Sequence, residues 1–152
     1  MRRILFPCLA LLGIFLLHQA KADDQGKVQS VPKTGLKITG SVDADDPKVN
    51  VEIGGKVVGK LPAKMHLVQF KAGKRYRIDM KSTEIDSVLV LQDKEGKQVA
   101  FDDDSGGNLD SLVFFDVTKD NTYKVFTASL KGTGNFTMTI SDEAALKVHD
   151  VG

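Results

Sequence analysis

Apolar residues recur at every second position through most of the chain after residue 33. The alternation is clearest at Tyr76, Ile78 and Met80, which are separated by charged residues. A period of two places successive side chains on opposite faces, so this run predicts a half-buried β-strand. Val88–Leu91 is apolar at every position, which predicts a central strand buried on both faces. No stretch of ten residues in this region carries the 3.6-residue period of a helix.

Turn residues separate the apolar runs at short intervals. Gly54–Gly55 predicts a hairpin, and Asp93–Gly96 and Lys131–Gly134 predict further turns. Seven to nine short strands with this spacing predict an all-β sandwich or barrel in a single domain. The other strands are expected around Leu36–Val42, Val49–Ile53, Val68–Phe70, Val99–Phe101, Leu112–Phe115, Tyr123–Val125 and Phe136–Ile140, and Val57 and Val58 are expected to start the return strand after Gly54–Gly55.

The first residues predict an exported protein. Arg2 and Arg3 precede an almost wholly apolar run over 4–17, and Ala20-Lys21-Ala22 follows it. A basic start, an apolar run and small residues at the cleavage site are typical of a secretory signal peptide. The alternative is an uncleaved membrane anchor, but a membrane span needs roughly 20 apolar residues and the run over 4–17 is shorter. We therefore expect a signal peptide over 1–22, a flexible lead-in over 23–33, the β-domain over 34–141 and a polar tail over 142–152.

Cleavage changes the charge and the chemistry that remain. The chain has 21 Lys and Arg against 20 Asp and Glu, and the segment 1–22 contains three of the basic residues and no acidic one, leaving 18 against 20. This balance gives no bulk attraction to nucleic acid, and no membrane span is expected after cleavage. Cys8 is the only cysteine, so the mature chain has no disulfide or thiolate site. We expect a secreted or periplasmic protein.

An acidic loop is the most informative segment for chemistry. Four carboxylates and one amide lie within nine positions, on Asp102, Asp103, Asp104, Asn108 and Asp110, around a Gly-Gly pair. Oxygen ligands on a tight loop suit Ca²⁺, although the spacing is not that of an EF-hand. The alternative is a structural turn in which Asp, Asn and Ser hydrogen-bond their own backbone. The second acidic stretch, 43–47, has the same two explanations, and Pro47 favours a turn there.

No catalytic motif accompanies these residues. The mature chain has two histidines, of which His149 lies in the tail and His66 follows the alternation of a strand. Neither a nucleophile elbow, nor a zinc-protease helix, nor a phosphate loop is present. We therefore expect a protein that is not an enzyme. Basic residues at Lys71, Lys74, Arg75, Arg77 and Lys81 either meet an acidic partner or simply solvate one face.

An ordered series of motifs resembles the bacterial pre-peptidase C-terminal (PPC) domain. The series is Phe70–Asp79, Ser82–Asp86, Val88–Asp93 with Gly96, the loop Asp102–Gly107, and the two closing segments 121–125 and 134–139. It spans about Asp43 to Ile140, and Asp45-Asp46-Pro47 is similar to versions in which the module forms a whole small secreted protein.

This resemblance implies a jelly-roll-like antiparallel β-sandwich. Such modules accompany secreted hydrolases without being catalytic, and some relatives bind calcium or fibrous protein. It adds Asp86 to the candidate Ca²⁺ ligands, because Asp86 precedes the central strand and is expected to face the acidic loop. We expect a non-catalytic module that binds or stabilises an extracytoplasmic protein or polysaccharide. The alternatives are a structural or assembly protein of the cell envelope, and an accessory subunit of a secreted hydrolase.

Overall fold

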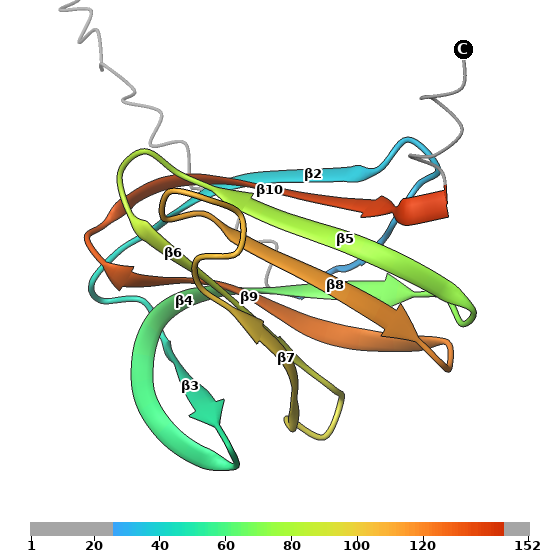
Figure 1. Ribbon diagram of the computed structural model, residues 1–152, viewed down its shortest axis with the longest axis horizontal. Coiled ribbons are helices and arrows are strands. Elements are labelled where there is room, and N and C mark those ends of the chain that lie inside the picture. The colour runs from blue at the N-terminus through green and yellow to red at the C-terminus, as the bar shows by residue number, and fades with distance from the viewer. Residues whose placement is uncertain (1–25, 145–152) are drawn as a thin grey trace, which may run out of the picture.

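The computed structural model describes residues 26–144, which form a β-sandwich of ten strands (Figure 1). The predicted signal peptide and residues 145–152 of the predicted tail lie outside the described residues. The strands are β1 (Val28–Ser30), β2 (Leu36–Val42), β3 (Lys48–Ile53), β4 (Lys56–Phe70), β5 (Lys74–Lys81), β6 (Asp86–Gln92), β7 (Gln98–Asp102), β8 (Ser111–Val117), β9 (Asn121–Lys131) and β10 (Gly134–Asp142).

Two sheets pack face to face. One has the order β1-β4-β9-β6-β7 with β3 added to β4, and the other has the order β2-β10-β5-β8. All pairings are antiparallel except that of β1 with β4. The fold class predicted from the sequence is confirmed.

Two predicted boundaries need correction. The flexible lead-in predicted over residues 23–33 contains the strand β1. This strand forms because its backbone pairs with β4, and three residues are too few to show the period of a strand in the sequence. Asp142, assigned to the polar tail, ends β10 and pairs with Lys74 at 2.7 Å.

The main core lies between the sheets. Tyr76, Ile78 and Met80 of β5 are almost wholly buried, as their alternation predicts. The Phe70 ring packs against Tyr76 in a tilted arrangement with ring centroids 4.6 Å apart, and the Tyr123 ring lies 5.7 Å from that of Phe70. Aromatic pairs at such separations add to the burial of apolar area, which is the main stabilising term in a domain without disulfides.

A second, smaller core lies on the outer face of the larger sheet. Val88 and Val90 point away from the sandwich and are buried against Val49 and Val51 of β3. β3 reaches them because the 15-residue strand β4 pairs with β9 along its second half and curls outward along its first (Figure 1). The prediction that β6 is buried on both faces is confirmed.

Candidate functional site

Two buried serines bring the start of β6 and the end of the acidic loop together. The hydroxyl groups of Ser87 and Ser111 lie 2.9 Å apart, and both side chains are buried. The Ser111 hydroxyl donates to the Ser87 carbonyl at 2.7 Å, and the Ser111 N–H donates to the Ser87 hydroxyl at 3.0 Å. Asp86 and Asp110, each one residue before these serines, are therefore held at the same end of the sandwich.

Two of the predicted ligands make hydrogen bonds that hold the loop. The Asp102 carboxylate accepts the N–H groups of Ser105 at 3.0 Å and Leu112 at 2.9 Å. The Asp110 carboxylate accepts the N–H of Ser82 at 3.0 Å. The bond to Ser105 is the local side-chain to backbone bond that a structural turn predicts, and the bonds to Leu112 and Ser82 are of the same kind over longer distances in the sequence.

Asn108 also fits the structural explanation. Its φ of 55° lies in the left-handed region, which Asn tolerates better than most residues. Here Asn108 helps to line a hollow of about 610 Å³, and Asp86, Asp110 and Lys131 line the same hollow.

Among the remaining predicted ligands, Asp86 has a buried polar atom that is unsatisfied. Its Oδ1 is buried and has no hydrogen-bond partner among the described residues. Burial, and then the nearby carboxylates of Asp104 and Asp103, raise the pKa of Asp86, while Lys131 lowers it to a smaller extent. Within residues 26–144, no three acidic, His or Cys side chains gather in an arrangement that could hold a metal ion.

The second acidic stretch is a turn. The Asp46 carboxylate accepts the N–H of Asp43 at 2.8 Å and also pairs with Lys64 of β4. Both carboxylate oxygens of Asp46 therefore have donors, and the turn explanation of residues 43–47 accounts for its acidity.

His66 is a core residue of β4. It is 7% exposed, its Nε2 lies 3.0 Å from the Thr127 hydroxyl, and its ring meets Phe136 edge to face. A histidine packed in this way has no free access to a substrate.

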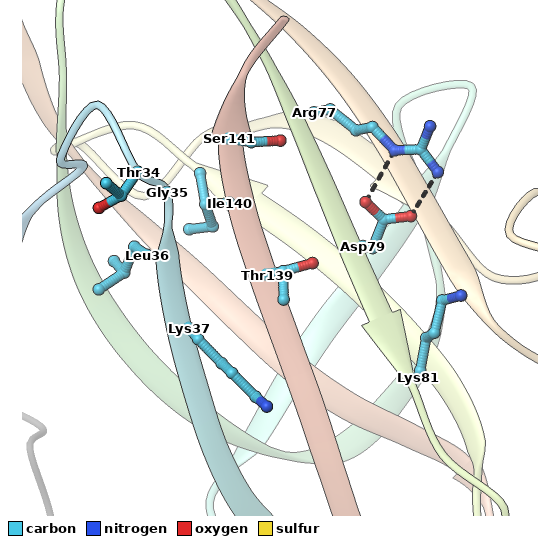
Figure 2. Close-up of a pocket in the computed structure, with 10 residues that line it drawn as sticks. All are labelled: Thr34, Gly35, Leu36, Lys37, Arg77, Asp79, Lys81, Thr139, Ile140 and Ser141. Carbon is cyan, nitrogen blue, oxygen red and sulfur yellow. Dashed lines mark hydrogen bonds and ion pairs between the residues drawn. The ribbon is translucent and has the colours of Figure 1, made fainter. Parts of the chain in front are cut away.

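The outer face of the smaller sheet forms a second candidate site. The strand register aligns Lys37 of β2 with Thr139 of β10, and Thr139 with Asp79 of β5. Figure 2 shows Thr139 between these two side chains, with Lys81 further along β5. They surround a shallow depression of about 530 Å³, which Ser141 and Arg77 also line.

Only part of the predicted basic face is free of carboxylates. Lys71 pairs with Asp120 at 3.0 Å, and Lys74 with Asp142. Arg77 donates two hydrogen bonds to Asp79, both at 2.8 Å (Figure 2). This pairing is the main cause that raises the pKa of Arg77. Arg75 lies 3.2 Å from Glu143.

Lys37 and Lys81 remain without an ion pair in the described part of the chain. Lys37 was not among the predicted basic residues. Its place between Leu36 and Ile38 indicates an outward side chain, but only the order β2-β10-β5 brings it near Lys81. The depression therefore carries two uncompensated positive charges beside the hydroxyls of Thr139 and Ser141.

A half-exposed aromatic ring extends this face. Phe114 of β8 lies opposite Arg77 in the register and is 43% exposed. The Arg75 guanidinium lies 5.1 Å from its ring centroid, within the range of a cation–π contact. The face thus offers cations, hydroxyls and one aromatic surface.

Comparisons with known proteins identify the fold. The PPC domain of a collagenase from Bacillus anthracis matches with a TM-score of 0.54 and 12% identity, over 76% of this chain and 93% of that one. The chain therefore has a PPC-like β-sandwich fold. No family model matches, and neither does any curated protein sequence.

Two periplasmic inhibitors of g-type lysozyme are also similar, at lower scores. The protein from Aeromonas hydrophila has a TM-score of 0.48 and 10% identity, over 76% of this chain and 97% of that one. The protein from Salmonella Typhimurium has a TM-score of 0.44 and 9% identity, over 77% and 98%. The fold assignment rests on the collagenase domain.

Proposed function

We propose that this protein is an exported, non-catalytic binding module whose partner is a polyanion, most simply an acidic polysaccharide. The observation that carries the proposal is the outer face of the smaller sheet, where Lys37 and Lys81 lack carboxylate partners beside the Thr139 hydroxyl. Export is supported by the basic, apolar and small-residue pattern of residues 1–22.

The shape of the face favours an extended ligand. The depression is open and crosses three strands, from Lys37 on β2 to Arg77 and Lys81 on β5, so it cannot enclose a small molecule. A polymer bearing repeated carboxylates can contact both lysines at once, and its hydroxyls can bond Thr139 and Ser141. The binding of two sites on one chain gains from effective concentration.

The same proposal includes that the protein has no catalytic activity of its own. His66 is buried against Phe136, and the acidic loop uses Asp102 and Asp110 to hold its own backbone. Neither arrangement offers a general acid and base with access to a common substrate.

We also propose that calcium stabilises the acidic loop and the adjacent Asp86. Asp86 supports this, because its buried oxygen lacks a donor and the nearby carboxylates of Asp103 and Asp104 disfavour its ionisation. A bound Ca²⁺ would supply the missing charge, and binding would draw these two loop residues towards Asp86. Asp102, Asn108 and Asp110 stay in the proposed ligand set, since a carboxylate or amide oxygen that accepts one hydrogen bond retains lone pairs for a cation.

Affinity for a polyuronate, with a neutral glucan as the comparison, tests the proposal by isothermal titration. Lys37→Ala with Lys81→Ala should weaken polyuronate binding about five- to tenfold. The matched control, Lys97→Ala with Lys119→Ala, removes two exposed lysines from turns elsewhere and should change affinity little. Equal binding of both glycans, or equal losses in the two double variants, would refute the assignment of this face.

The same titration, together with one enzyme assay, separates the alternatives. A structural or assembly protein of the envelope would bind neither glycan. An accessory subunit of a hydrolase would change the turnover of a polymer-degrading enzyme when mixed with it, whether or not Lys37 and Lys81 are intact.

A further inference from the structure

The β3–β4 hairpin ends in an apolar tip that the body of the protein leaves uncovered. Ile53, Val57 and Val58 are 58%, 53% and 59% exposed. Figure 1 shows the hairpin extending away from the two sheets. Single exposed aliphatic residues are ordinary on protein surfaces, but three of them lie at one projecting turn. Ile53 pairs with Lys56 and Val57 with Glu52, so the tip carries apolar side chains on both of its faces.

The apolar positions on one face of β3 continue beyond the part of the strand that is buried in the second core. Val49 and Val51 are buried in the second core, and the two-residue period places Ile53 in the same phase. Across the hairpin, the pairing passes from Glu52–Val57 to Val51–Gly59. Val58 therefore stands at a β-bulge, a feature that redirects side chains.

The base of the tip is fixed to the sandwich. The Glu52 N–H donates to the side-chain oxygen of Gln98 on β7 at 2.9 Å, and the Gln98 amide donates to the Glu52 carbonyl at 2.8 Å. This two-bond contact clamps the hairpin one residue before Ile53. The exposed tip is thus held outward on a supported base, which lowers the entropic cost of binding with it.

The charge and composition of the tip decide between partners. Residues 53–60 contain Lys56 and Lys60 and no acidic residue, and neither lysine has an ion pair within the described chain. Aromatic residues and Arg, which dominate protein–protein hot spots, are absent, and Lys is depleted at such interfaces. Aliphatic groups beside lysines instead suit a bilayer, where the ammonium groups stay among lipid phosphates.

We infer that the β3–β4 tip binds an anionic phospholipid surface. Ile53, Val57 and Val58 enter the boundary between headgroups and acyl chains, while Lys56 and Lys60 contact the phosphates. The tip lies at the end of a strand pair outside the Lys37–Lys81 face, so this inference does not depend on the binding of a polyanion there.

Co-sedimentation with vesicles tests the inference. Residues 23–152 are used, because the apolar run over 4–17 would enter vesicles by itself and residues 26–144 contain both cores. Vesicles of phosphatidylcholine with one third phosphatidylglycerol should bind the protein more strongly than vesicles of phosphatidylcholine alone. The triple variant Ile53→Thr, Val57→Thr, Val58→Thr keeps β-branched side chains and should lose about tenfold in partition coefficient.

Matched variants make the test specific. Val28→Thr, Val99→Thr, Leu130→Thr removes three exposed aliphatic side chains from other sites and should bind vesicles like the unchanged protein. Lys56→Gln with Lys60→Gln should remove the preference for the anionic vesicles.

Failure of the unchanged protein to sediment would overturn the inference, as would equal sedimentation of the tip variant. Self-association that the tip variant abolishes, without vesicle binding, would overturn it in favour of contact with a second copy.

Discussion

The Ser87 and Ser111 hydroxyls meet 2.9 Å apart in the interior and join β6 of one sheet to β8 of the other. The Ser87 hydroxyl and N–H also both lie 3.0 Å from the Leu109 carbonyl, which fixes the end of the acidic loop. The two hydroxyl side chains also bond backbone atoms in this buried region, namely the Ser87 and Leu109 carbonyls and the Ser111 N–H. Asp86 and Asp110, two of the proposed calcium ligands, directly precede these two serines in the sequence.

Ser111→Ala should destabilise the domain by about 1–3 kcal/mol, because it removes the hydroxyl that donates to the buried Ser87 carbonyl and contacts the Ser87 hydroxyl. Urea unfolding followed by tyrosine fluorescence measures the change. Ser30→Ala, at an exposed position of β1, is the control and should stay within about 0.5 kcal/mol of the unchanged protein. Similar values for the two variants would mean that the junction is not a stabilising contact.

Asp86→Asn should raise the melting temperature at neutral pH in the absence of calcium. Since the folded-state pKa of Asp86 is raised, its ionisation destabilises the fold, and stability falls as pH increases from the unfolded value, near 3.8, through the raised folded value. The amide removes this penalty, so the gain over the unchanged protein should vanish in acid. Melting curves at several pH values measure it, and a loss of stability at neutral pH would contradict the assignment.

Millimolar Ca²⁺ should raise the melting temperature of the unchanged protein, and Mg²⁺ should not. A ligand present at 100 times its Kd that binds only the folded state adds about 2.7 kcal/mol. Asp103→Asn with Asp104→Asn should abolish the rise, as should Asp86→Asn. Melting in EDTA provides the baseline, and an unchanged midpoint in Ca²⁺ would leave the loop as a hydrogen-bonded turn.

Glu84→Gln should lower the melting temperature at pH 7 and have no effect in strong acid. The backbone N–H of Asn135, 2.8 Å away, and then its side-chain amide hold the pKa of Glu84 below 4.5. Stability from a depressed pKa is present above the unfolded value and is lost as pH falls through the folded one. Glu95→Gln, in an exposed turn, is the control. A destabilisation of Glu84→Gln that persists in acid would assign its effect to packing.

The sequence predicts well those features that depend on near neighbours. Alternation along Tyr76–Met80 identifies β5, and the uniformly apolar run Val88–Leu91 identifies β6. Gly54 and Gly55 form the predicted hairpin turn, in which both adopt positive φ angles. The parallel strand β1 escapes prediction, because three residues carry no period and their partners lie on β4.

The candidate sites depend on longer-range packing. Six residues share the chemistry of calcium ligands, but the backbone N–H groups of Ser82 and Leu112 bond Asp110 and Asp102. No local sequence pattern predicts these two hydrogen bonds. Likewise, Lys37 and Lys81 are 44 positions apart in the sequence and approach only through the strand order β2-β10-β5.

Amide chemical-shift mapping with an oligouronate tests the central claim most directly. In ¹⁵N-labelled protein, titration should shift the amides of Lys37, Thr139 and Lys81 and their outward-facing neighbours on β2, β5 and β10, and added salt should reverse the shifts. The β3–β4 tip should not respond. Shifts confined to other surfaces, or none at saturating oligouronate, would contradict the proposal that the outer face of the smaller sheet binds a polyanion.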